Sequence, residues 1–175
     1  MTPHRVELRA LIPVIVAASL LACSTGTPAS ASDSPAGQGA AEPAEAADPQ
    51  TAYFAGGCFW CMEGPFEALE GVVEVVSGYT GGPEENPTYR EVASGQTGHT
   101  EAVRVEYDAS VVSYEALLRV FWRSMDPTDG GGQFADRGSQ YRPAIFVRND
   151  AERAAAEASK AELAENGPFD APIVV

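Results

Sequence analysis

The stretch from residue 24 to residue 50 limits where this chain can fold. It contains no aromatic residue and no valine, isoleucine, leucine or methionine. A segment of this composition cannot bury enough apolar surface to offset the entropy lost on ordering, so we expect a flexible tether. The folded part then lies in residues 51–175, which is enough chain for one domain with its own hydrophobic core.

The N-terminal 22 residues have the pattern of an export signal. Arg5 and Arg9 precede a short apolar run, which is too short to span a bilayer. The run ends in "LLAC", which resembles the lipobox of bacterial lipoproteins, in which cleavage leaves the cysteine, here Cys23, to be lipidated. An ordinary cleaved signal is the alternative. We therefore expect a lipoprotein signal peptide at 1–22, a lipidated Cys23 with its tether at 23–50, and an exported protein held at the bacterial cell envelope.

The charge of the chain excludes several kinds of partner. Eleven Lys and Arg residues stand against 25 Asp and Glu residues, for a net charge of −14. This balance argues against nucleic acid or an anionic membrane surface as a partner, so the lipid is the one membrane contact that we expect. Three cysteines are too few for a disulfide scaffold. We expect a monomer with a solvated surface.

Periodicity and turn residues predict the order of the folded elements. Strands are predicted at 51–55, 72–76, 100–107 and 143–148, and helices at 58–69, 113–125 and 150–166. This order is that of an α+β fold, the ferredoxin-like α/β sandwich (β-α-β-β-α-β), with one helix added.

Some elements carry more specific expectations. The strand at 72–76 has apolar residues on both faces, so we expect it to be central in the sheet. Phe121 and Trp122 fall on the apolar stripe of their helix and should pack in the core. Asp150 is expected to cap the last helix and Gly167 to end it. The loops at 77–99 and 126–141 are longer than packing requires, and such loops tend to carry function.

The segment "GGCFWCMEG" at residues 56–64 holds two of the three cysteines. A zinc site needs four ligands, and His99 is the one further plausible nitrogen ligand of the domain. Haem attachment needs a histidine where Met62 stands. Cys58 follows a glycine pair at the expected first turn of a helix, where free N–H groups and the helix dipole stabilise a thiolate. That position favours a nucleophile, although the spacing by itself leaves two structural thiols as an alternative.

Glu101 occupies an unusual position in the strand at 100–107. Strand alternation places it in one row with Val103, Val105 and Tyr107. Desolvation in such a row would raise the pKa of the carboxyl and make it a proton donor. A carboxylate that bends into water at the strand end is the alternative. Beside the cysteines, Phe59 and Trp60 are expected to line a pocket for a small apolar group.

Several ordered motifs resemble one enzyme family. "GGCFWCMEGPFEALEGV", "SGYTGG", "PTYREVASGQTGHTEAVRVEYD" and "GGGQFADRGSQYRPAIF" together resemble the A-type peptide methionine sulfoxide reductases, from about residue 52 to the end. The resemblance implies reduction of the S epimer of methionine sulfoxide, free or in oxidised proteins. It makes Cys58 the nucleophile and Glu101 the acid. For substrate binding it implies Phe59 and Trp60 around the ε-methyl group, and Tyr89, Asp136 and Tyr141 as polar partners.

The implied chemistry gives each cysteine a function. Attack by Cys58 on the sulfoxide leaves a sulfenic acid, and Cys61 condenses with it to a disulfide. A thioredoxin-like dithiol protein then restores the pair, with no bound cofactor and no metal. A general exported thiol–disulfide oxidoreductase is the rival enzyme, and a tethered domain that binds Met-containing peptides is the rival without catalysis.

The chain departs from the family pattern at two places. Met125 stands where many members have a histidine, which we do not count as catalytic. Members also continue past the "PIVV" at residues 172–175 into a further strand and a tail, so either those residues are missing from this sequence or the domain is shortened at its C-terminal end.

Overall fold

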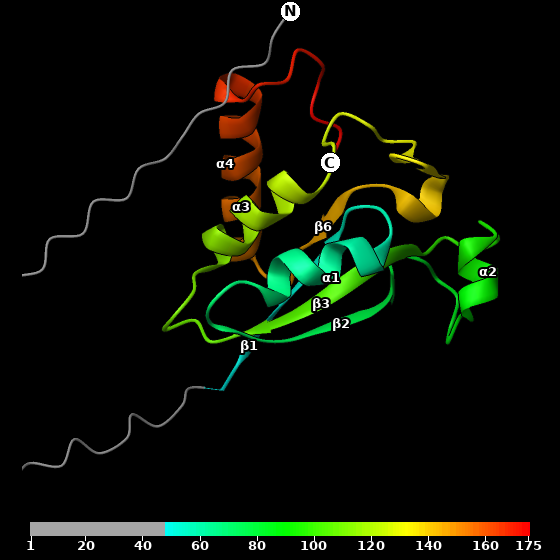
Figure 1. Ribbon diagram of the computed structural model, residues 1–175, viewed down its shortest axis with the longest axis horizontal. Coiled ribbons are helices and arrows are strands. Elements are labelled where there is room, and N and C mark those ends of the chain that lie inside the picture. The colour runs from blue at the N-terminus through cyan, green and yellow to red at the C-terminus, as the bar shows by residue number, and fades with distance from the viewer. Residues whose placement is uncertain (1–47) are drawn as a thin grey trace, which may run out of the picture. The chain divides into compact units, whose positions relative to one another are not determined.

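The computed structural model describes residues 48–175 (Figure 1). The predicted signal peptide, Cys23 and nearly all of the tether lie outside the described residues. Along the chain the main elements are β1 (Gln50–Ala55), α1 (Phe59–Glu67), β2 (Val72–Thr80), α2 (Tyr89–Ala93), β3 (Thr100–Tyr107), α3 (Tyr114–Ser124), β4 (Gly132–Gln133), β5 (Asp136–Arg137), the 3₁₀ turn η1 (Ser139–Tyr141), β6 (Ala144–Phe146) and α4 (Asp150–Asn166).

The main sheet confirms the predicted fold class. Its strand order is β2-β3-β1-β6 and every neighbouring pair is antiparallel. This is the arrangement of a ferredoxin-like sandwich, and α4 is the added helix. β4 and β5 form a separate two-stranded hairpin inside the predicted loop at 126–141.

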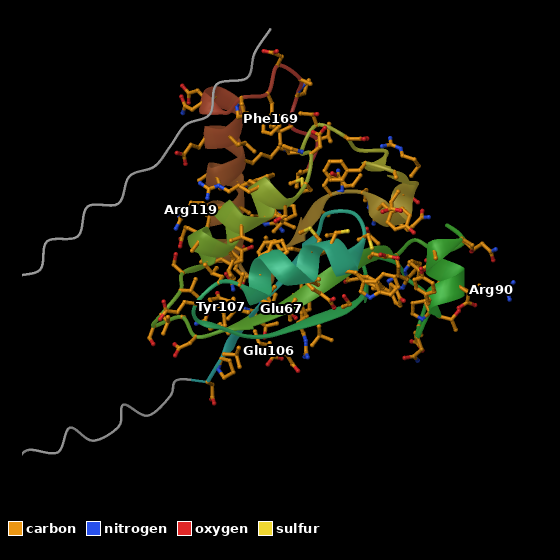
Figure 2. The ribbon with its side chains drawn as sticks, viewed as in Figure 1. Glu67, Arg90, Glu106, Tyr107, Arg119 and Phe169 are labelled. Atoms are coloured by element: carbon orange, nitrogen blue, oxygen red, sulfur yellow. The ribbon has the colours of Figure 1, made fainter. Side chains whose placement is uncertain are left out.

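One face of the sheet carries the hydrophobic core, under α1 and α3. Phe54 of β1 stacks between Phe66 of α1 and Phe121 of α3, with ring centroids 5.0 and 5.4 Å apart. Phe121 and Trp122 are buried, as predicted. On the opposite face Arg104 forms an ion pair with Glu106 at 3.1 Å, and Glu106 projects away from the helices (Figure 2). The period of two in β3 therefore separates an apolar face from a charged one.

The structure corrects three predictions about individual elements. β2 is an edge strand, not a central one, because it pairs with β3 alone; Val73 is accordingly 63% exposed. The predicted loop at 77–99 holds the end of β2 and the short helix α2. The cap of α4 is Asn149 rather than Asp150, since the Asn149 side chain accepts a 2.8 Å hydrogen bond from the Glu152 N–H. Gly167 ends α4 as predicted, and none of the helices within 48–175 is long and apolar enough to cross a membrane.

Candidate active site

The turn between β1 and α1 explains the glycine pair. Gly57 has a φ of +97°, which L side chains rarely adopt, and a Cβ added to it would lie 2.6 Å from Cβ of Gln133. A Cβ on Gly56 would lie 2.7 Å from Sδ of Met62. At Gly57 both the positive φ and the Gln133 contact require glycine, whereas a side chain at position 56 would have to displace the buried end of Met62. This close passage delivers Cys58 to the N-cap position of α1.

Two opposing effects act on the Cys58 thiol. Burial raises its pKa above the usual value and is the largest cause, while hydrogen bonds from the backbone N–H groups of Trp60 and Cys61 lower it. The Cys61 and Glu101 charges add to the rise. The N–H groups at the helix start lower the pKa as predicted, but burial outweighs them, so the pKa of the resting thiol is raised rather than lowered. Cys61 is exposed one helical turn away, and both cysteines are free thiols.

Glu101 is buried beside the cysteine turn. Its side chain is 1% exposed, and its Oε2 accepts a 3.1 Å hydrogen bond from the backbone N–H of Phe59. Burial raises the pKa of the carboxyl, the Asp136 charge raises it further, and the Phe59 hydrogen bond opposes them. The alternative in which Glu101 bends into water is therefore wrong. A carboxyl in this environment retains its proton to a higher pH than an exposed one.

Aromatic rings surround the helix start. The buried Phe59 ring has its centroid 5.2 Å from that of Trp60, 5.9 Å from Tyr79 and 6.4 Å from Tyr89. Trp60 and Tyr89 are 64% and 50% exposed, and their centroids are 6.2 Å apart. Phe59 thus forms an apolar floor with two exposed rings above it, which suits a small apolar group such as a methyl.

Tyr89 is held at the first position of α2 by a capping box. The Thr88 hydroxyl accepts from the Glu91 N–H at 3.4 Å, and the Glu91 carboxylate accepts from the Thr88 N–H at 2.8 Å. A capping box satisfies the free N–H groups at a helix start. The loop that was predicted to carry function therefore presents Tyr89 from a fixed helix.

Tyr141 and Asp136 complete the set of predicted residues. Burial is the largest cause of the raised pKa of the Tyr141 hydroxyl, and the charges of Glu101, Asp136, Tyr89 and Cys58 add to it. Asp136 is exposed on β5 and Tyr141 is half-buried in η1. The charges that act on the Tyr141 hydroxyl show that Glu101, Asp136, Tyr89 and Cys58 lie near it, while the functions predicted for these residues stay predictions.

Two site residues were not predicted. Tyr79 pairs with Glu101 in the β2–β3 ladder, and burial together with the Glu101 charge raises the pKa of its hydroxyl. Gln133 is 2% exposed and its side chain packs on Gly57. The "SGYTGG" motif contained the first residue, but its role follows from strand pairing, which the motif does not reveal.

Possible metal-binding groups and a cavity are the features to consider outside this site, in the described part of the chain. Within residues 48–175 no group of three or more His, Cys, Asp or Glu side chains is placed to hold a metal ion. A cavity of about 590 Å³ lies between α3, α4 and residues 167–169, where Arg119 and Phe169 are labelled in Figure 2. None of its lining residues belongs to the site described above.

Comparisons with known proteins identify the family of the chain. The family model for peptide methionine sulfoxide reductase matches residues 50–175. The peptide methionine sulfoxide reductase MsrA of Bacillus subtilis is 60% identical over 125 residues, which cover 71% of each chain. The MsrA of Ligilactobacillus salivarius is 57% identical over 124 residues, or 71% of this chain and 72% of the relative.

Solved structures agree as well. Methionine sulfoxide reductase A of Corynebacterium diphtheriae superposes with a TM-score of 0.62 at 34% identity, covering 73% of this chain and 66% of that one. Reduced Mxr1 from Saccharomyces cerevisiae gives a TM-score of 0.65 at 28% identity, covering 73% and 76%. The chain belongs to the peptide methionine sulfoxide reductase family.

Proposed function

We propose that this protein reduces methionine sulfoxide, in proteins and as the free amino acid, to methionine. The observation that carries the proposal is the buried Glu101 carboxyl hydrogen-bonded to the residue that follows Cys58, at the edge of an aromatic floor. A nucleophilic sulfur, a retained proton and an apolar surface are the three things that this reduction needs. The family membership supports the same reaction.

The first step transfers the oxygen. The Cys58 sulfur attacks the sulfoxide sulfur while Glu101 delivers a proton to the oxygen. The S–O bond of the substrate and the new S–S bond then break as the hydroxyl passes to the Cys58 sulfur, so methionine leaves and Cys58 becomes a sulfenic acid. The sulfoxide gains two electrons and the Cys58 sulfur loses them.

The next steps form a disulfide and then restore the thiol. Cys61, one helical turn away and exposed, attacks the sulfenic acid and releases water as a Cys58–Cys61 disulfide forms. An external dithiol then reduces this disulfide through a mixed disulfide. We propose a thioredoxin-like protein as that donor, because Cys61 is accessible to a protein surface.

The residues around Cys58 and Glu101 bind the substrate. Phe59 and Trp60 contact its ε-methyl group, while Tyr89, Tyr141 and Asp136 bind the sulfoxide oxygen or the flanking backbone. This division fits their environment, since Phe59 is buried and Asp136 is exposed. A methyl on one side of the sulfur and a proton donor on the other select one epimer, for which we propose the S form.

One assay tests the reaction. The reduced protein, without external reductant, is mixed with a peptide that contains the S sulfoxide, and methionine and thiols are counted. We expect about one methionine formed and about two thiols lost per protein, and neither with the R sulfoxide or with Cys58→Ser. Retained turnover in Cys58→Ser contradicts the mechanism. Reduction of insulin-type disulfides without any sulfoxide reduction favours a general oxidoreductase, and binding without methionine formation favours a peptide-binding domain.

A separate proposal concerns location. We propose that the mature protein is a monomeric lipoprotein, exported and anchored to a bacterial membrane through Cys23. The "LLAC" pattern and the acidic charge support it, since a net charge of −14 disfavours other contact with an anionic surface. Cys23→Ala should move the protein from the membrane to the soluble fraction. Unchanged fractionation contradicts the lipid anchor, and a dimer by light scattering contradicts the monomer.

A further inference from the structure

The hairpin formed by β4 and β5 places a bulky aromatic residue where a glycine is normally found. Gln133 pairs with Asp136, so the loop between the strands consists of Phe134 and Ala135. Phe134 has a φ of 51°, in the left-handed region. The first position of such a two-residue loop favours glycine when its φ is positive, and a bulky residue there is strained.

The Phe134 ring gains nothing from packing in return for this strain. It is 79% exposed, the highest value among the large hydrophobic residues described. Strained backbone that is not explained by packing is found preferentially at functional sites. The strain and exposure of Phe134 therefore favour a contact with a ligand over a structural role.

The hairpin is held rigidly enough to maintain the strain. The Gln133 side chain accepts from the Asp126 N–H at 2.7 Å and donates to the Asp126 and Asp129 carbonyls at 2.9 and 3.2 Å. Arg137 donates to the Asp129 carboxylate at 3.1 Å. These bonds tie both strands of the hairpin to the segment before it, so Phe134 is presented in a fixed position.

Gln133 and Asp136, which flank this loop, both lie next to the active site. Gln133 packs on Gly57, next to Cys58. The charge of Asp136 raises the pKa of Glu101 and of Tyr141. The hairpin lies beside η1, which carries Tyr141 (Figure 1). Phe134, which lies between Gln133 and Asp136 in the hairpin loop, is therefore at the rim of the site.

We infer that Phe134 is a specificity-determining residue, which contacts the polypeptide on either side of an oxidised methionine. This inference rests on the proposed function. The sulfoxide side chain is small and is covered by the inner residues, so a ring on the rim reaches only what extends beyond it. The contact favours apolar neighbours of the oxidised methionine, and the free amino acid does not make it.

The test compares three S-sulfoxide substrates under single-turnover conditions with pre-reduced protein. These are free methionine sulfoxide, a peptide with leucine on both sides of the sulfoxide, and the same peptide with glycine on both sides. Phe134→Gly should lower the second-order rate constant for the leucine peptide by about tenfold. The glycine peptide should lose less, and the free amino acid should react as with the parent.

Matched variants separate this role from a structural one. Phe134→Gly relieves the backbone strain, so its melting temperature should be equal to or above that of the parent. Phe134→Tyr should retain the parent's rate with the leucine peptide. Val73→Ala removes an exposed apolar side chain at the far end of β2 and should leave all three rates unchanged.

Four outcomes count against the inference or against the function on which it rests. An equal loss with all three substrates means that the hairpin acts on the chemistry and not on peptide selection. Unchanged single-turnover rates with slower thioredoxin-driven turnover mean that the ring contacts the reductant. A parent that reduces none of the substrates overturns the proposed function itself, whereas a parent that reduces all of them equally well, with Phe134→Gly unchanged, overturns only the role of Phe134.

Discussion

The backbone N–H of Phe59 donates a 3.1 Å hydrogen bond to Oε2 of Glu101, 42 residues later in the chain. This bond joins the turn that carries Cys58 to the first residues of β3. A carboxyl oxygen can accept it whether the group is ionised or protonated. The bond therefore holds the acid beside the nucleophile in both states that a proton donor must pass through.

Glu101→Gln should slow the chemical step by about 10²- to 10⁴-fold, since the amide keeps the shape but delivers no proton. Because burial raises the pKa of Glu101, the parent's single-turnover rate should decline as pH rises through that value. In the variant this decline of the rate should be missing. The increase of the rate with pH that comes from ionisation of the Cys58 thiol should remain. The measurement is methionine release against pH in a single turnover.

The control for this variant lies on the same strand. Glu106→Gln changes a carboxylate on the opposite face, paired with Arg104, and should leave the pH profile as in the parent. A Glu101→Gln rate within about threefold of the parent, with the same profile, would show that no positioned acid acts here.

Glu101→Gln should also change how stability depends on pH. The folded-state pKa of Glu101 is raised, so the unfolded state ionises first, and the stability linked to the protonated carboxyl is lost as pH rises through the folded value. Glutamine escapes this loss. In urea unfolding, the free energy of unfolding of the variant minus that of the parent should therefore increase from pH 4 to pH 8. A difference that does not vary with pH would contradict the raised pKa.

Local patterns and long-range pairing account for what the sequence could and could not predict. The alternation of β3 is a property of consecutive residues, so the buried side of Glu101 could be predicted. The neighbours of β2 are not encoded in its own four valines, and the prediction of a central strand was wrong. Tyr79 lies opposite Glu101 because of the register between β2 and β3. Phe134 has a positive φ because of the hairpin that contains it. Neither has a sequence pattern of its own.

Cys61→Ser should separate oxygen transfer from recycling. The variant should release about one methionine per protein and then stop, with a sulfenic acid on Cys58, because a hydroxyl cannot form the disulfide. Mass spectrometry with a sulfenic-acid probe should detect a sulfenic acid on Cys58 in the variant and a Cys58–Cys61 disulfide in the oxidised parent. Normal cycling of the variant with a dithiol protein would show that Cys61 is not the resolving residue.

Gly57→Ala should damage the site more than the fold. Alanine is disfavoured at a φ of +97°, and its Cβ would lie 2.6 Å from Cβ of Gln133, so the turn or the hairpin must shift. The two effects together should cost about 2 kcal/mol or more of the free energy of unfolding. A shift of this turn moves Cys58 and the Phe59 N–H relative to Glu101, so the single-turnover rate should fall even where urea titration shows a fully folded variant.

Gly64→Ala is the matched control, because Gly64 lies inside α1 and a Cβ there meets nothing within 4 Å. Alanine is favoured over glycine in a helix interior, but Pro65 disfavours a helical side chain at the position before it, so the free energy of unfolding should change by less than about 1 kcal/mol and the rate should stay unchanged. The two glycines differ by seven positions in one segment, so the pair distinguishes backbone geometry at the nucleophile from helix stability. If Gly57→Ala reacts as fast as Gly64→Ala, the tight turn is not what positions Cys58, and the close contact with Gln133 serves the hairpin alone.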